Sequence, residues 1–535
     1  MSNNEWGDFQ TPLALATSAL DSLGQSRWTR VLEPTCGIGS FLKASMQLGA
    51  TVERIGIEVQ PDYVGAARAA GFAVLPINIF DLDFGKDLPW QSDGPLLVIG
   101  NPPWVTNAQL GSLGSLNLPA KSNIRNLRGL DAMTGASNFD IAEFIFLKLM
   151  VELQSEAPTI SMLVKTHVAR NVLSYAEQFG LPYSGFNMRA IEAKTWFGAN
   201  VDACLFTVEY SENPEYICHI CSSIDSEEPS HTIGVIGGRL VADIQRYERT
   251  SFADGESPLE WRSGVKHDAS AVMEITAETR DELGLEHPYV LPLLKCTDLF
   301  RGRLEPRKCM VIPQRRFGED TAHLKEDAPA LWSYLEANAG VLDGRGSSIY
   351  RSQPRFAVFG LGDYTFAPYK IAISGLHKEV RFVLLGCNEG RAVVVDDACY
   401  ILAFEDGLEA AMCFALLTST ATMDLLESLV FWDAKRPINK KLLQRVDLLA
   451  VARKTPTSDL EAPANEAASE LGIQRPPSWR AVLDKLEATW ESAITTPRRG
   501  RALRPKEVLQ PIGADDVHQA ALDAVLLGEA TATDT

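Results

Sequence analysis

The chain of 535 residues lacks a long apolar run, and its longest strictly apolar stretch is the eight residues 410–417. A membrane-spanning helix needs about 20 such residues, so we expect no membrane span. The first residues lack the basic patch and apolar stretch of a secretory signal. The nine cysteines are scattered and odd in number, so they do not predict a disulfide framework. Together these absences predict a cytoplasmic protein without a membrane partner.

Positive charge is also scarce, because 50 Lys and Arg stand against 69 Asp and Glu, a net charge of −19. Taken over the whole chain, this excess argues weakly against a nucleic-acid partner. The excess is uneven: residues 1–245 carry 15 basic and 26 acidic side chains, whereas residues 246–455 carry 27 and 30. Basic clusters lie at 291–316 and 435–445. Each cluster is either a solvated face or part of a nucleic-acid-binding surface.

Short apolar strands alternate with helices in the first third of the chain. Thr11 is a candidate N-cap for the first helix, and Pro12 is expected at its first position. Strands that alternate with helices predict an α/β fold with a doubly wound parallel sheet, whose ligands lie at the carboxyl ends of the strands. We expect helices at 13–23, 62–70 and 139–153, and strands at 30–33, 54–58, 73–77, 96–99, 160–164 and 203–208.

A glycine turn with Gly37 and Gly39 follows the first expected strand, which ends at Glu33. Glycines allow a ligand to approach the backbone closely, although a purely structural turn would look the same. The spacing is not that of a dinucleotide-binding motif. Glu58 and Asp81 follow the next two strands, where carboxylates suit the hydroxyls of a ribose and the amine of an adenine. These residues predict an adenosine-type ligand.

The tetrapeptide Asn101-Pro102-Pro103-Trp104 directly follows the fourth expected strand. Asn and Pro are common turn residues, but here an aromatic residue follows at once and the glycine turn lies upstream. With these motifs in this order, the sequence resembles the gamma class of N6-adenine DNA methyltransferases, which use S-adenosylmethionine. The resemblance is good over residues 9–209 and weaker beyond. It implies a class I, Rossmann-like methyltransferase fold.

The resemblance also implies roles for individual residues. The Asn101 side-chain oxygen and the Pro102 carbonyl would accept the two N–H bonds of the target amine, and Trp104 and Phe197 would stack on the flipped adenine. A core position is the alternative for Phe197, and Trp196 is its rival. No metal is required. Residues matching the cofactor-binding motifs are Thr11, Glu33, Gly37, Gly39, Glu58, Asp81 and Asn101.

We divide the chain into a methyltransferase domain (1–245), a β-rich target-recognition domain of mixed α/β structure (246–455) and a C-terminal segment (456–535). The segment 261–268 is similar to the start of a target-recognition domain in the gamma class. Strands are expected at 289–298, 356–369 and 380–395, a polar linker at 455–470 and an amphipathic helix at 478–494. Candidate DNA contacts, each of which also fits a plain surface or turn, are Lys266, His267, Arg301, Arg303, Arg315, Arg316, Lys440 and Lys441.

Three further patterns remain open. The stretch 111–138, with Lys121, Arg125 and Arg128, is either a surface loop or a flap that contacts DNA, and the basic residues at 498–501 pose the same choice. The spacing of Cys218 and Cys221 is zinc-like, but no second pair lies nearby, so we expect no metal. Too few residues precede the first cofactor segment to hold an N-terminal nuclease.

The resemblance implies that the chain methylates the N6 amine of adenine in a specific sequence of double-stranded DNA. It would be the modification component of a restriction–modification or phage-defence system, with a separate restriction or defence subunit. Methylation of another amine is an alternative, in RNA adenine, DNA cytosine N4 or a protein glutamine. A non-catalytic DNA-binding subunit is a third hypothesis, and the full set of motif residues argues against it.

Overall fold

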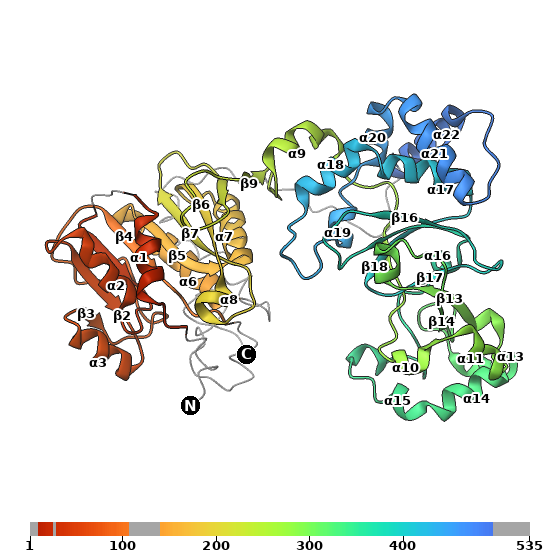
Figure 1. Ribbon diagram of the computed structural model, residues 1–535, viewed down its shortest axis with the longest axis horizontal. Helices are drawn as coiled ribbons and strands as arrows, with labels where there is room; N and C mark the ends of the chain where they lie inside the picture. Colours follow the sequence, from red (N-terminus) through yellow and green to blue (C-terminus); the bar gives the residue numbers. More distant parts are fainter. Residues whose placement is uncertain (1–8, 25–27, 106–139, 496–535) are drawn as a thin grey trace, which may run out of the picture.

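The computed structural model describes residues 9–24, 28–105 and 140–495, which form two lobes that lie side by side (Figure 1). The first lobe is built on a ten-stranded sheet and the second on two four-stranded sheets. The chain passes from one to the other near helix α9 (Ile244–Thr250), which packs against strand β9 of the first lobe and helix α18 of the second.

The large sheet has the order β10-β9-β8-β6-β7-β5-β4-β1-β2-β3. Strands β1 to β5 are parallel neighbours, and β7 runs antiparallel between β5 and β6. Strands β1 and β4 are buried along their whole length, which requires cover on both faces of the sheet. The strands are β1 (Arg30–Glu33), β2 (Glu53–Ile57), β3 (Ala73–Leu75), β4 (Leu96–Gly100), β5 (Thr159–Lys165), β6 (Tyr183–Ile191), β7 (Ala203–Tyr210), β8 (Ile217–Cys221), β9 (His231–Ile236) and β10 (Arg239–Val241).

Helices of the first lobe connect these strands. Apolar residues from the helices and the strands share one hydrophobic core. The parallel order β5-β4-β1-β2-β3, with helices between the strands and the antiparallel β7 next to β5, confirms the expected doubly wound, class I methyltransferase fold. Because β1, β2 and β4 are parallel, the residues that follow them meet at one edge of the sheet. The helices are α1 (Leu13–Asp21), α2 (Ser40–Ala44), α3 (Pro61–Ala69), α6 (Ile141–Glu152), α7 (Thr166–Gln178) and α8 (Ala193–Phe197).

Helix α1 begins as expected, but its cap differs from the prediction. Pro12 occupies the N-cap position and makes no side-chain cap bond, so the prediction that Thr11 caps this helix is wrong. The Thr11 hydroxyl instead accepts a hydrogen bond from Asn101, at 3.3 Å. The residue is therefore tied to the tetrapeptide rather than to the helix.

The second lobe contains two four-stranded sheets, β11-β18-β15-β16 and β12-β14-β13-β17. They are predominantly antiparallel, and β13 and β17 form a parallel pair. The first sheet and the C-terminal helices share one core, and the second sheet packs with a separate group of helices. The strands are β11 (Arg262–Ser263), β12 (Glu274–Ile275), β13 (Val290–Leu294), β14 (Lys308–Val311), β15 (Tyr369–Ser374), β16 (Phe382–Leu385), β17 (Val394–Val395) and β18 (Cys399–Phe404).

The C-terminal helices of this lobe pack around α17, which is almost fully buried. Within the described ranges, no single helix is long and apolar enough to cross a membrane, and only α17 and α18, bent by 59°, meet that test as a pair. The helices are α10 (Ser270–Met273), α11 (Ala277–Glu282), α12 (Cys296–Phe300), α13 (Leu324–Asp327), α14 (Pro329–Ala337), α15 (Ala339–Asp343), α16 (Asp363–Phe366), α17 (Gly407–Leu417), α18 (Thr420–Leu429), α19 (Lys440–Leu443), α20 (Leu448–Lys454), α21 (Thr457–Glu470) and α22 (Trp479–Thr495).

The strands expected at 289–298 and 380–395 are partly confirmed, because the first range holds β13 and the start of α12 and the second holds β16 and β17 with a loop between them. Two other secondary-structure predictions for this lobe are wrong. Residues 356–369 are mostly a loop with the short helix α16, and their apolar side chains fill the core without forming a strand. Residues 455–470, expected as a linker, form helix α21 instead. Its composition is polar, but Leu460 and three alanines lie on one face and are buried in the same core as α17. The helix expected at 478–494 is confirmed as α22.

Side chains also join the two lobes. Asp433 of the second lobe accepts hydrogen bonds from Thr166 at 2.6 Å and Arg170 at 2.8 Å, both at the start of α7. The ring of Phe431 lies under the same guanidinium, 4.5 Å from the ring centre. The junction is therefore anchored next to the carboxyl end of β5.

Candidate active site

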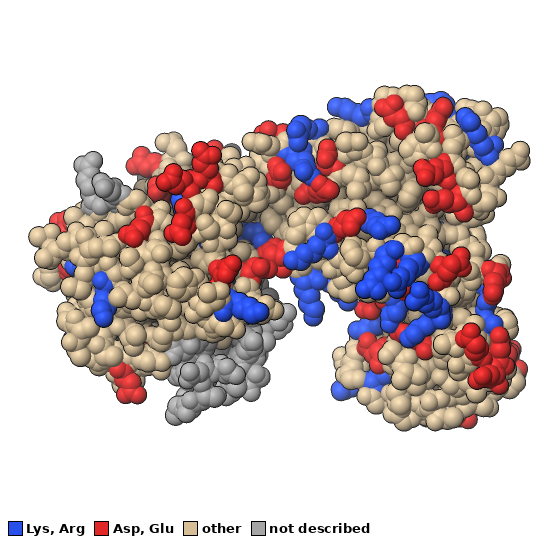
Figure 2. All heavy atoms as spheres, viewed as in Figure 1, with Lys and Arg blue, Asp and Glu red and all other residues tan. Residues whose placement is uncertain are grey.

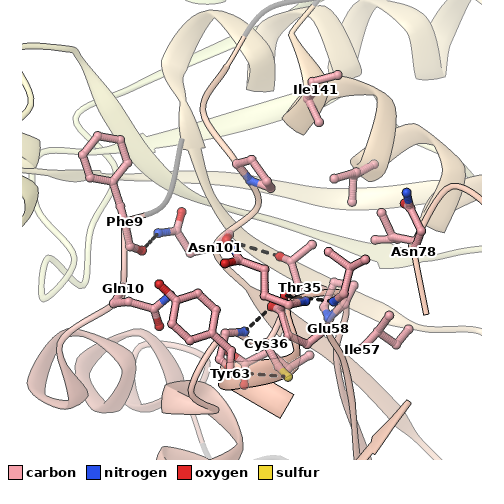
Figure 3. A pocket seen from close by; sticks show the side chains of 18 of the residues that line it. Phe9, Gln10, Thr35, Cys36, Ile57, Glu58, Tyr63, Asn78, Asn101 and Ile141 are labelled. Carbon is pink, nitrogen blue, oxygen red and sulfur yellow. Dashed lines mark hydrogen bonds between the residues drawn. The ribbon is translucent and has the colours of Figure 1, made fainter. Parts of the chain in front are cut away.

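The glycine turn between β1 and α2 forms one wall of a cavity at the carboxyl ends of the central strands (Figure 3). Gly37 has a φ of +50°, which favours glycine, and a Cβ there would lie 2.6 Å from the Gln10 side-chain oxygen, so a larger residue would also displace Gln10. Glu33 is buried on the same wall, and its carboxylate accepts from the N–H groups of Phe41 and Leu42 at 3.4 and 3.0 Å. Burial raises the pKa of Glu33, and these two donors oppose the rise.

Glu58 follows β2 and lines the cavity beside the glycine turn. One carboxylate oxygen accepts from the Gly37 N–H at 2.9 Å, and the other accepts from the N–H groups of Val59 and Gln60 at 2.9 and 2.8 Å. A carboxylate has about four lone-pair sites, so it can accept from ligand hydroxyls as well. Glu58 therefore both holds the turn in place and presents acceptors to the cavity.

Two of the predicted cofactor residues do not line the cavity. Asp81 is exposed, and Asn78 lies on the cavity wall in its place. Strand β3 ends at Leu75, two residues earlier than expected. The residue that reaches the cavity after this strand is therefore Asn78, and Asp81 lies beyond it. Gly39, the other such residue, is the N-cap of α2 with a φ of +80°, so it allows the chain to turn into the helix without lining the cavity.

Asn101 follows β4, and two hydrogen bonds orient its side chain, of which Figure 3 shows the one to Phe9. Nδ2 donates to the Phe9 carbonyl oxygen at 3.1 Å and to Thr11 Oγ1 at 3.3 Å. A carbonyl oxygen can only accept, so these contacts identify the nitrogen end of the amide. Oδ1 is buried and has no hydrogen-bond partner among the described residues. An unpaired buried acceptor costs about 1–3 kcal/mol, so it marks a place where a ligand N–H is expected.

Three aromatic rings gather next to this amide. The rings of Trp104 and Phe197 meet edge to face, with centroids 5.3 Å apart and planes at 75°. Phe9, which the motifs did not single out, touches both rings with centroid distances of 5.7 Å. Trp196, the rival of Phe197, is 37% exposed. Because Trp104 and Phe197 are in contact, a base can stack between them only after a ring moves.

Lys165, the last residue of β5, fixes the end of the tetrapeptide. Its Nζ donates to the Trp104 carbonyl oxygen at 3.1 Å and to Asp140 Oδ2 at 2.7 Å. The Asp140 carboxylate is buried and caps α6 by accepting from the Ala142 N–H at 3.1 Å. One ammonium group therefore ties the tetrapeptide to α6. No sequence pattern marks Lys165, because its partners lie 61 and 25 residues away.

We expect Lys165→Met to lower kcat for methyl transfer by about 10²-fold while changing cofactor affinity little, because small displacements of a catalytic loop are costly. Steady-state kinetics and calorimetric titration of the cofactor measure the two quantities. Lys148→Met is the matched control, since Lys148 forms a 2.5 Å ion pair with Glu152 on α6 away from the tetrapeptide. Equal kcat values for the two variants would contradict a positioning role for Lys165.

The predicted DNA contacts of the second lobe divide into buried and exposed side chains. His267 is buried, its Nδ1 accepts from the Ala269 N–H at 3.1 Å, and its Nε2 lies 3.4 Å from the Glu274 carboxylate. The prediction that His267 contacts DNA is therefore wrong. Burial lowers the pKa of His267, which favours the neutral ring. Lys266 is partly exposed and pairs with Asp268 at 3.5 Å.

The other predicted cations remain accessible. Figure 2 shows Lys and Arg side chains gathered around β13, β14, β17 and β18, next to the hollow between the lobes. Lys440 pairs with Glu260 at 3.1 Å, and Arg316 lies 3.8 Å from Asp363. Side chains of the predicted set that are exposed are Arg301, Arg303, Arg315, Arg316 and Lys441.

The remaining sequence candidates lie elsewhere. Cys218 and Cys221 are buried on β8, and within residues 9–24, 28–105 and 140–495 no group of three His, Cys, Asp or Glu side chains is placed to hold a metal ion. The stretch 111–138 with its three basic residues lies outside the described residues. The basic residues at 498–501 lie outside them too.

Comparisons with known proteins identify relatives of the chain. No family model matches the chain. It is 37% identical over 471 residues to the type II methyltransferase M.NspV of Nostoc sp. (strain ATCC 29411 / PCC 7524), covering 84% of this chain and 97% of the relative. It is 30% identical over 104 residues to the type II methyltransferase M.CvrRI of Paramecium bursaria Chlorella virus XZ-6E, covering 19% of this chain and 26% of the relative. The structure of the type IIL restriction-modification enzyme MmeI in complex with DNA matches with a TM-score of 0.49 and 13% identity, over 90% of this chain and 76% of that one.

Proposed function

The chain belongs to the type II methyltransferases, and from this premise we propose that it methylates the N6 amine of a flipped adenine in a specific sequence of double-stranded DNA. As a member of this family it is a DNA methyltransferase of a restriction–modification system and uses S-adenosylmethionine. What we propose beyond this is that the methylated base is adenine, that the methylated atom is N6, and that the residues described above bind the base and the cofactor.

The residues that line the cavity suit S-adenosylmethionine in their chemistry. Gly37 and Gln10 lie together on the wall of the cavity, and the glycine presents only backbone there. The carboxylates of Glu33 and Glu58 suit the ammonium group and the ribose hydroxyls of the cofactor. Apolar side chains such as Ile57 and Phe80 offer apolar surface for its adenine. When bound, the cofactor supplies a methyl group on a positively charged sulfur.

The orphan oxygen of Asn101 is the single observation that carries the proposal. The lone pair of an exocyclic amine is delocalised into its ring, which makes the nitrogen a weak nucleophile. Asn101 Oδ1 and the Pro102 carbonyl would each accept one N–H, which favours a pyramidal nitrogen with a localised lone pair. Both acceptors are held before the base arrives, because the prolines fix their φ angles and Asn101 is anchored to Phe9. After transfer, the methylated nitrogen releases one proton to water.

The aromatic cluster supports a flipped base as the substrate. An adenine inside a duplex cannot reach the Asn101 amide, so it must leave the stack. Once a ring has moved, Trp104 and Phe197 would offer ring faces on which the base could stack. Phe9 lies against both and would have to shift as the base enters. We further propose that the chain works in the cytoplasm beside a separate restriction or defence subunit.

Nucleoside analysis of DNA methylated by the purified enzyme tests the choice of base. Incubation with unmethylated DNA and isotope-labelled S-adenosylmethionine, followed by enzymatic digestion and mass spectrometry, should place all label in N6-methyladenine. Label in N4-methylcytosine would overturn the assignment to adenine while leaving DNA methylation intact. Unlabelled DNA, together with labelled RNA or protein glutamine in a parallel incubation with cell RNA and protein, would overturn it as well.

A further inference from the structure

Phe317 exposes 63% of its surface on a loop that follows β14. Its neighbours Arg315 and Arg316 are exposed as well. An aromatic ring in water forgoes the free energy that burial would give it. A single exposed ring is ordinary on a protein surface. A functional role for Phe317 is therefore argued from the structure of its loop and from the residues around it.

The loop is held at its base and at its tip. Gln314 is buried and pairs with the backbone of Val358, donating from Nε2 at 3.1 Å and accepting at Oε1 at 3.2 Å. The Glu319 carboxylate accepts from the N–H groups of both arginines, at 2.8 and 2.9 Å. Gly318, with a φ of +76°, turns the chain directly after the ring. Phe317 therefore stands at the tip of a preorganised turn.

The surroundings of the loop suit nucleic acid. The Phe317 ring leans on Phe359 with centroids 5.6 Å apart, and Phe359 in turn meets Tyr350 at 5.2 Å. The Arg315 guanidinium lies over the Phe366 ring, 4.5 Å from its centre. Lys and Arg side chains gather on this lobe next to the hollow between the lobes (Figure 2). Aromatic rings that alternate with arginines bind bases by stacking and phosphates by charge.

We propose that Phe317 enters the duplex at the step from which the target base has left, and that it stabilises the opened stack. The proposal rests on base flipping in the proposed function and adds a residue that acts on the DNA rather than on the amine. Proteins that open or kink a duplex insert apolar side chains between base steps in this way. The two flanking arginines would hold the adjacent phosphates, which keeps the ring aimed at the stack.

The test compares a paired and an unpaired target. It uses the full-length protein and its recognition duplex, identified first from the methylation pattern of the wild-type enzyme. Phe317→Ala should lower kcat about 10-fold on the duplex with the target adenine paired to thymine. On a duplex in which the same adenine faces an abasic site, kcat should return close to the wild-type value, because the base is already free to leave. With 2-aminopurine at the target position, the fluorescence of the Phe317→Ala complex should be lower than that of the wild-type complex on the paired duplex. On the duplex with the abasic site, the two should be close to equal.

Two variants complete the design. Val341→Ala removes another apolar side chain of the same lobe, which is 52% exposed on α15. This variant should leave kcat unchanged on both duplexes. Phe317→Trp should keep most of the activity, since it keeps a ring at the tip. Equal kcat losses on paired and unpaired targets, or no loss on either, would overturn the proposal. A wild-type enzyme without N6-methyladenine product would instead overturn the proposed function.

Discussion

Asn101→Ala should lower methyl transfer by at least about 10²–10³-fold while cofactor affinity stays close to the wild-type value. The size of the loss is that of removing one preorganised polar group from the reacting centre. The substitution deletes the orphan acceptor and the anchor to Phe9 and Thr11. Single-turnover kinetics with saturating cofactor measure the rate, and calorimetric titration measures the affinity.

Two further variants separate acceptor loss from general disruption. Asn101→Asp keeps an acceptor but places a carboxylate oxygen near the Phe9 carbonyl, now 3.1 Å from Nδ2, so we expect an intermediate rate. Asn78→Ala changes another amide of the same cavity and should weaken cofactor binding more than it slows transfer. Turnover of Asn101→Ala at the wild-type rate would contradict the role assigned to this side chain.

Glu58→Ala should raise the dissociation constant of S-adenosylmethionine by about 10²-fold. A hydrogen bond to a charged group contributes roughly 1.5–3 kcal/mol, and this carboxylate holds three backbone N–H groups as well as the expected ribose hydroxyls. Its loss would release the Gly37 N–H and loosen the turn that the cofactor lies against. Calorimetric titration of the variant with S-adenosylmethionine and with its demethylated product measures the change.

Glu53→Ala is the matched control for this variant. Glu53 lies on the same strand, β2, and its carboxylate also accepts backbone N–H bonds, from Gln91 and Ser92, but it does not line the cavity. It should cost stability without changing cofactor affinity. Equal affinities for the Glu58 and Glu53 variants would show that Glu58 supports the fold and does not bind the cofactor.

Much of the first lobe could be predicted from the sequence because its signals are local. Buried parallel strands are short apolar runs, and the turn with Gly37 and the tetrapeptide at Asn101 directly follow such runs. Parallel strands then bring their ends to one edge whatever the loops do. The position of Glu58 beside the glycine turn follows from that geometry, whereas the order of the strands is seen only in the structure.

Other features depend on packing that the sequence does not display. His267 looks like a surface cation, but tertiary contacts bury it against Glu274. Residues 455–470 look like a linker because alanine and polar residues dominate, yet α17 supplies the apolar surface that makes them a helix. Lys165 acts through partners distant in sequence, which no local pattern reveals.

The charge distribution also corrects a first impression. The net charge of −19 argues weakly against nucleic acid, but the largest share of the excess acid lies in residues 1–245. In the second lobe, cations gather beside the hollow between the lobes (Figure 2). Whole-chain charge thus averages a cofactor-binding lobe with one that carries the clustered cations. We expect DNA binding to weaken as salt rises.

Expression in a host free of DNA methylation, followed by base-resolution sequencing, shows whether the enzyme methylates adenine in DNA. We expect N6-methyladenine at one recurring sequence in the genome of cells with the wild-type enzyme. We expect none in cells with Asn101→Ala at the same protein level. An unmodified genome, despite confirmed binding of S-adenosylmethionine by the wild-type protein, would contradict the proposed function.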